Sequence, residues 1–70
     1  MNDYARRIYL AINYIHAHFD QAITLADLAQ AAHFSPYHFH RIFTAFQHET
    51  PNDYLRRVRI ERAANLLLIH

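Results

Sequence analysis

The stretch ITLADLAQAAHFSPYHF, residues 23–39, decides the fold of this chain because it contains the same kind of helix start twice. In residues 23–28 and again in residues 34–39, an apolar residue precedes a hydroxyl residue, and another apolar residue follows four positions after the hydroxyl. A capping hydroxyl flanked by such an apolar pair is a signature of a helix N-terminus. The two caps, Thr24 and Ser35, lie 11 residues apart. This spacing predicts two short helices joined by a tight turn.

The segment before this stretch predicts another helix, over residues 3–18, because apolar residues recur there at intervals of three and four. The next helix is expected over residues 25–32, with Thr24 as its cap and Asp27 as the acid of a capping box. The residues expected to face the core are Tyr4, Ile8, Ala11, Ile12, Ile15 and Phe19 in the first helix and Leu25, Leu28, Ala29 and Ala32 in the second.

The third helix is expected to follow a turn at residues 33–34 and to run over residues 36–47. Ser35 is its cap, and Pro36 stands at the first helical position, where a missing N–H costs nothing. The helix has two different faces. Phe39, Ile42, Phe43 and Phe46 form the apolar face, and Tyr37, His40, Arg41, Thr44 and His48 form the opposite one.

A similar start at Thr50, Pro51 and Asp53 predicts a fourth helix over residues 51–68. The apolar run at residues 66–69 exceeds what three small helices can cover, which indicates either a missing partner or the sticky tail of a shortened chain. The expected fold class is all-α, with four helices and short connections. The inward candidates on the fourth helix are Tyr54, Leu55, Val58, Ala63, Leu66 and Leu67.

The composition excludes several classes of function. The chain has 70 residues and no cysteine, so neither disulfides nor thiolate metal sites are available. It has no glycine, which argues against phosphate-cradling loops and nucleotide-binding fingerprints. No apolar run approaches the roughly 18 residues of a membrane span. The net charge is only +1, but every fixed cation is an arginine, the side chain suited to paired contacts with phosphate or guanine.

The outward face of the third helix points to double-stranded DNA as the partner. In a helix-turn-helix the second helix enters the major groove, and residues near its N-terminus reach base edges. Tyr37, His40 and Arg41 are the candidates for base contact, because Arg41 can pair with guanine, His40 can bond a base edge and Tyr37 can pack on a thymine methyl. The alternative is that Tyr37 only covers the turn and Arg41 pairs with an acid. The candidates for contact with the DNA backbone are Thr24, Ser35, Thr44 and His48.

Metal binding and catalysis are not expected, in spite of seven histidines. The pairs His16/His18 and His38/His40 are two residues apart and diverge around a helix, whereas a helical zinc pair needs a spacing of three or four. Ser35 is occupied by capping, so no catalytic triad is apparent. We therefore expect no cofactor, no metal and no enzyme activity.

Three runs of the chain resemble the AraC/XylS family of bacterial transcription regulators. They are LADLA at residues 25–29, FSPYHFHRIF at residues 34–43 and TPNDYLRRVR at residues 50–59. Their order and spacing are specific, and the resemblance covers nearly the whole chain. It implies a homeodomain-like helix-turn-helix bundle of three helices followed by a long linker helix, with base-reading positions at Tyr37, His40 and Arg41.

The resemblance also implies a longer protein. The family's DNA-binding domain has about 100 residues and two helix-turn-helix units. Residues 1–70 would be a partial domain, with the first unit at about 3–48, the linker helix at about 51–68 and the second unit absent. The third helix is similar to that of members followed by a GyrI-like small-molecule-binding domain. The family usually has glycine where this chain has His48, so a left-handed backbone there would cost roughly 1 kcal/mol unless the helix runs on.

The expected function is therefore sequence-specific DNA binding in the bacterial cytoplasm, on nucleoid DNA. A helical protein-interaction or dimerisation module is the alternative. It would use the apolar end of the fourth helix, and a homodimer through that helix is compatible with DNA binding.

Overall fold

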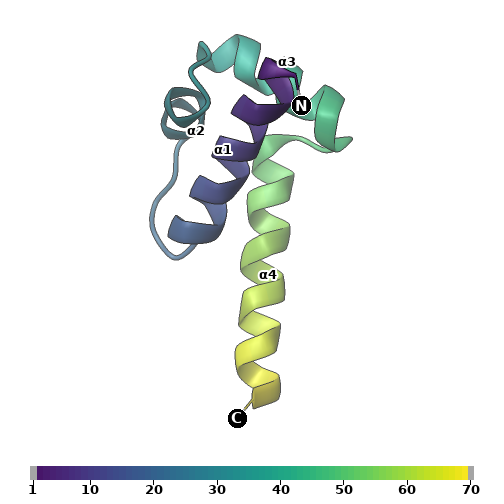
Figure 1. Cartoon of the computed structure of the whole chain (residues 1–70). Helices are drawn as coiled ribbons and strands as arrows, with labels where there is room; N and C mark the ends of the chain where they lie inside the picture. Colours follow the sequence, from purple (N-terminus) through teal and green to yellow (C-terminus); the bar gives the residue numbers. More distant parts are fainter. Residues whose placement is uncertain (1, 70) are drawn as a thin grey trace.

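The computed structural model describes residues 2–69, and the side chains of residues 2–66. The four helices are α1 Asp3–His18, α2 Leu25–Ala31, α3 Pro36–Gln47 and α4 Pro51–Ile69 (Figure 1). Residues 2–69 contain no strand, which confirms the all-α fold. The observed ends differ from the expected ones by a single residue in α2 and in α4.

Polar side chains cap all four helices. Asn2 Oδ1 accepts the Ala5 N–H at 2.7 Å, and Ser35 Oγ accepts the His38 N–H at 3.3 Å. The expected capping box of α2 is present: Thr24 Oγ1 accepts the Asp27 N–H at 3.1 Å, and the Asp27 carboxylate accepts the Thr24 N–H at 3.0 Å. Thr50 Oγ1 accepts the Asp53 N–H at 3.1 Å. The caps fix where each helix begins, and so they fix the lengths of the turns.

The core lies where α1, α2 and α3 meet the first half of α4. Figure 1 shows α3 crossing one end of the bundle while α1 lies beside the upper part of α4. Phe39 and Phe43 of α3 are fully buried and pack against each other with ring centroids 5.4 Å apart. The buried hydrophobic residues are Ile8, Ala11, Ile15, Leu28, Ala29, Ala32, Phe39, Phe43, Tyr54, Leu55 and Val58.

The second half of α4 extends past the other helices (Figure 1). Burial on α4 stops at Val58, and residues 59–66 are all exposed. The expectation that Ala63 and Leu66 face the core is therefore wrong: both are exposed, Leu66 by 59%. The reason is that α1 lies only beside the upper part of α4 and ends well short of its tip, so it cannot cover them (Figure 1). Leu67 lies outside the residues whose side chains are described.

Three other residues expected in the core are partly exposed: Tyr4 by 41%, Leu25 by 39% and Phe46 by 40%. Each lies in the first or last turn of its helix, where no neighbouring helix covers it. Tyr4 instead packs edge to face on Phe34, with ring centroids 5.3 Å apart. Thr44, expected on the outward face, is half-buried.

Two histidines have a left-handed backbone, His33 in the turn between α2 and α3 (φ 61°) and His48 at the end of α3 (φ 59°). Helix α3 ends where expected, so the structure confirms the left-handed conformation at His48. The His48 N–H donates to the Thr44 carbonyl at 2.9 Å, as in other helix C-termini of this kind. Both turns thus adopt a conformation that favours glycine, in a chain that has none.

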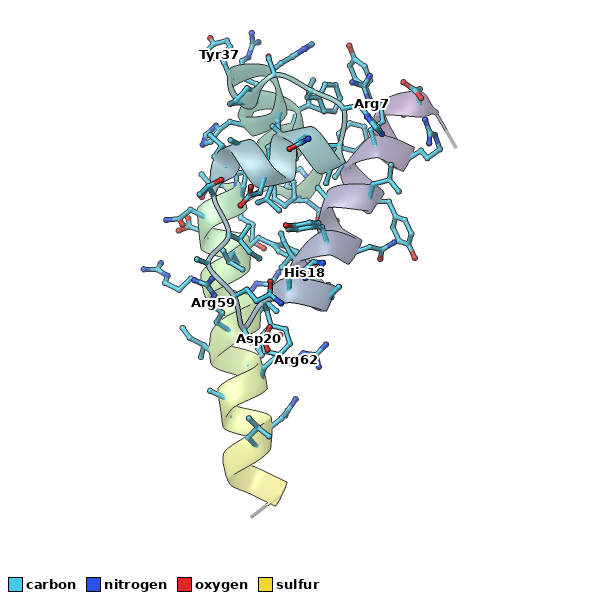
Figure 2. All side chains as sticks on the ribbon, turned by 90° about the vertical axis from the view of Figure 1, so that its left-hand side faces the viewer. Arg7, His18, Asp20, Tyr37, Arg59 and Arg62 are labelled. Carbon is cyan, nitrogen blue, oxygen red and sulfur yellow. The ribbon has the colours of Figure 1, made fainter. Side chains whose placement is uncertain are left out.

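Arg59 of α4 holds the loop that follows α1. Its Nε donates to the Phe19 carbonyl at 2.9 Å, and a terminal nitrogen donates to the Gln21 carbonyl at 2.8 Å (Figure 2). The guanidinium of Arg62 lies 5.0 Å from the centre of the Phe19 ring. The chain that enters α2 is therefore attached to α4.

Candidate nucleic-acid interface

The N-terminal half of α3 presents four polar side chains to solvent: His38, and three that share one face of the helix. Tyr37, His40 and Arg41 are all exposed, and Tyr37 is 75% exposed. In Figure 2, Tyr37 lies at the end of the molecule farthest from the tip of α4. On the opposite side of α3, Phe39 and Phe43 are buried. Because the core holds that side, the backbone of α3 keeps the three exposed side chains on one surface.

Arg41 differs from the other arginines. In the described part of the chain it makes no side-chain hydrogen bond, ion pair or ring contact, whereas the other six arginines each have at least one such partner. The alternative that Arg41 pairs with an acid therefore has no support among these residues. Its guanidinium keeps all five donors available for an external acceptor.

His40 lies beside the start of α2. It lines a groove of about 190 Å³ together with Ile23, Thr24, Leu25, Leu28, Pro51, Asn52 and Leu55. The structure thus brings together one candidate for base contact, His40, and one candidate for backbone contact, Thr24. These two come from the two helices of the helix-turn-helix.

The four candidates for contact with the DNA backbone differ in their free hydrogen-bonding capacity. The hydroxyls of Thr24 and Ser35 accept from their own helices, so each O–H remains free to donate. The Thr44 hydroxyl already donates to the His40 carbonyl at 2.7 Å, so it can only accept from a partner. His48 is exposed and ends α3, eight residues after His40, which is about 12 Å along a helix axis.

Two of the four arginines on α4 are paired with carboxylates. Arg57 pairs with Glu49 at 2.6 Å and with Glu61 at 3.2 Å. Hydrogen bonds from the guanidinium to these two carboxylates raise its pKa above the ordinary value. Arg56 contacts Asp53 at 3.5 Å. Arg59 and Arg62 of the same helix have no acid partner, but they contact the loop carbonyls and the Phe19 ring. Among the described residues, Arg41 of α3 is therefore the arginine whose guanidinium has no partner at all.

Two features near the site were missed by sequence reasoning. Arg7 of α1 contacts the turn between α2 and α3, although its backbone partners lie 25 and 26 residues further along the chain. The left-handed backbone of His33 was missed because the glycine that usually signals it is absent. An arginine next to Ile8, at the edge of the apolar stripe of α1, was the one available signal for the first feature.

Two other kinds of site are absent from the part of the chain that the structure describes. The described residues hold no group of three or more histidine, aspartate or glutamate side chains arranged to bind a metal ion. None of the described helices has both the length and the apolar character needed to cross a bilayer.

Comparison with known proteins gives consistent results. The chain is 37% identical over 59 residues to the bifunctional transcriptional activator/DNA repair enzyme AdaA of Bacillus subtilis (strain 168), a match that covers 84% of this chain and 28% of AdaA. It is 34% identical over 58 residues to the HTH-type transcriptional regulator YbfI of the same organism, covering 83% of this chain and 21% of YbfI. A third relative there, the HTH-type transcriptional regulator YobQ, is 30% identical over 60 residues, covering 86% and 25% of the two chains.

The chain therefore spans between a fifth and a third of the length of these relatives. No solved structure matches it significantly. The sequence profile of the bacterial regulatory helix-turn-helix proteins of the AraC family matches residues 15–56, which is more than half of the chain and includes α2, α3 and the start of α4. This match confirms the resemblance noted in the sequence: the chain belongs to the AraC family of bacterial regulatory helix-turn-helix proteins.

Proposed function

We propose that this chain binds double-stranded DNA sequence-specifically, with α3 as the recognition helix in the major groove, as part of a bacterial AraC-type transcription regulator. The observation that carries the proposal is the exposed Arg41 guanidinium, which has no partner among the described residues and shares its surface with His40 and Tyr37. An arginine with a free planar fork is the commonest side chain to read guanine.

Each of the three side chains has its own role in this proposal. Arg41 donates two parallel hydrogen bonds to O6 and N7 of a guanine. His40 bonds a base edge on the side of α3 that faces the start of α2. Tyr37 packs on a thymine methyl or donates its hydroxyl to a phosphate.

Thr24, Ser35, Thr44 and His48 set the register of the protein on the DNA backbone. The free O–H groups of Thr24 and Ser35 support this for the two helix starts. Thr44 must release the His40 carbonyl before it can donate to a phosphate, which makes it the weakest of the four contacts. His48 contacts the phosphates at the far end of α3.

The whole protein acts in the bacterial cytoplasm on nucleoid DNA and carries more than this chain. We propose a second helix-turn-helix that follows α4, and a separate effector-binding domain. In this proposal residues 1–70 bind DNA and catalyse no reaction, and any catalysis belongs to other domains. DNA repair is an activity named for AdaA, and the present chain covers only 28% of that protein.

Selection of randomised duplex DNA on the 70-residue chain, at low and then moderate salt, tests the proposal. We expect enrichment of a short motif that disappears with Arg41→Ala. Arg56→Ala is the matched control, because it removes an equal charge from an exposed position on α4. Recovery of unenriched DNA, bound only at low salt, would mean that the chain holds phosphates without reading bases.

The exposed second half of α4 favours a second function, self-association or docking of a helix. Ile60 is 61% exposed and Leu66 is 59% exposed, on a segment that no other described helix covers. We expect a mass above that of the monomer in light scattering at high concentration, and a monomeric mass for Leu66→Glu. A monomeric mass for the wild type at every concentration would exclude the self-association.

A further inference from the structure

Arg7 links α1 to the turn of the helix-turn-helix. Its Nε donates to the Ala32 carbonyl at 2.9 Å, and one terminal nitrogen donates to the His33 carbonyl. The other terminal nitrogen lies 3.3 Å from the Asp3 carboxylate. The guanidinium also lies over the ring of Phe34, 3.7 Å from its centre. Figure 2 shows Arg7 at the same end of the molecule as Tyr37.

These partners are the ones that determine how α3 leaves α2. The carbonyls at the end of a helix lack partners within it, and a cation there is favoured by the helix dipole. Ala32 and His33 end α2, and His33 has the left-handed backbone. Phe34 immediately precedes Ser35, the cap of α3. A single side chain from α1 therefore holds the end of α2, the turn and the start of α3.

The geometry points to Arg7 as a positioning residue for DNA reading: it fixes the angle of α3 against α2, and it does not contact a phosphate itself. Its Nε and one terminal nitrogen are committed to carbonyls, one face of its guanidinium is covered by Phe34, and only 19% of its side chain is exposed. This inference rests on the proposed function, because it concerns how α3 is presented to bases.

The neighbouring Arg6 provides a matched control. It carries the same charge and also contacts Asp3, at 3.0 Å. Its side chain is 58% exposed, and among the described residues it has no contact with the turn. Arg6→Met and Arg7→Met therefore remove the same charge from adjacent positions, but only the second change releases the turn.

The experiment compares the affinity of each variant for the selected duplex and for a scrambled duplex of equal length, over a series of salt concentrations. For Arg7→Met we expect a loss of roughly tenfold or more on the selected duplex, since two charge-assisted hydrogen bonds are removed. Affinity for the scrambled duplex and the salt dependence of binding should match those of Arg6→Met.

Two results would overturn the inference. An equal loss on both duplexes, with a salt slope lower by about one, would make Arg7 a phosphate contact. Unchanged affinities for both duplexes would show that the turn holds its angle without Arg7. A wild-type chain that does not prefer the selected duplex is a different failure, because it refutes the proposed function before any variant is made.

Arg7→Lys covers the case in which Arg7→Met does not fold. Lysine keeps the charge and the aliphatic stem, but it cannot bond both carbonyls while lying flat on Phe34. We expect a folded protein by circular dichroism, an intermediate loss of preference, and shifted amide resonances at residues 33–35 and at Tyr37, with those of α4 unchanged. A full preference together with unshifted resonances would contradict the positioning role.

Discussion

The α2–α3 unit and the second half of α4 differ in what holds them as helices. In the first, Leu28, Ala29, Phe39 and Phe43 are buried, and polar caps start both helices. In the second, residues 59–66 are all exposed. The helix is supported there by its own backbone bonds, by the contacts of Arg59 and Arg62 with the loop after α1, and by pairs such as Arg57–Glu61. Pairs of this kind contribute only about 0.2–0.5 kcal/mol each.

This difference teaches that the helical pattern of a sequence and the burial of a helix are separate properties. Isolated helices are marginal in water, and most of them gain their stability from packing of an apolar face. The α2–α3 unit gains that stability within the chain. The second half of α4 has the helical conformation without the packing, so a partner that covers it would add stability that the chain alone lacks.

Truncation of one buried and one exposed large side chain is the strongest test of this comparison. Phe43→Ala should lower the free energy of unfolding by about 3–5 kcal/mol, because Phe43 is fully buried and its ring packs against those of Phe39 and Tyr54. Leu66→Ala should change it by less than about 0.5 kcal/mol, since Leu66 is 59% exposed. Urea denaturation followed by circular dichroism measures both. Similar losses would show that the end of α4 is covered in solution.

A finer test uses two positions that lie two residues apart on α4, on either side of the limit of burial. Val58 is 2% exposed and Ile60 is 61% exposed. We expect Val58→Ala to cost about 1–3 kcal/mol and Ile60→Ala to stay within about 0.5 kcal/mol. Thermal unfolding of the two variants at equal concentration checks this. A larger cost at Ile60 that grows with protein concentration would favour self-association through α4.

His48 joins the two regions, and its left-handed backbone predicts a smaller effect of opposite sign. His48→Gly should raise the free energy of unfolding by about 0.5–1 kcal/mol, because glycine adopts this conformation without the steric cost. If His48 also contacts phosphate, the same variant will bind DNA less tightly while unfolding later. Chemical denaturation and DNA titration of one sample separate the two effects. A destabilised His48→Gly would mean that the side chain contributes more than its backbone costs.

The smallest expected effect concerns Tyr54, which anchors α4 to α1. Its hydroxyl lies 3.1 Å from His16 Nε2, and burial raises the pKa of its phenol above the ordinary 10.0. The group therefore supports the folded state below pH 10, and that support is lost as the pH rises through the folded pKa. Stability should fall in the alkaline range, and Tyr54→Phe should reduce this fall. An equal fall in both proteins would assign it to other tyrosines.

Much of the fold could be predicted from local signals. Three helix starts were predicted from Thr24, Ser35 and Thr50. Each hydroxyl accepts the backbone N–H three residues further on, as expected for a cap. Periodicity correctly placed Phe39 and Phe43 in the core. It was wrong for Leu25 and for other residues in terminal turns, because periodicity indicates which face a residue shares and does not indicate whether a neighbouring helix reaches that far.

The same distinction between local patterns and long-range packing applies to the candidate site. The exposure of Tyr37, His40 and Arg41 follows from the helical pattern of α3 and was predicted. The contact of Arg7 with the turn joins residues 25 and 26 positions apart, and no local pattern specifies such a pair. The same holds for the groove that places His40 beside Thr24, since it depends on how α2, α3 and α4 meet.

The contact of Arg59 with the loop after α1 has a consequence for the order of folding. Arg59 lies 40 positions after Phe19 and 38 positions after Gln21, and the intervening chain includes α2 and α3. Contacts of long sequence separation form late, because loop closure costs entropy before the contact compensates for it. We therefore expect the loop at residues 19–21 to become fully ordered when α4 docks. Hydrogen exchange in that loop reports the docking and release of α4, even while α2 and α3 stay folded.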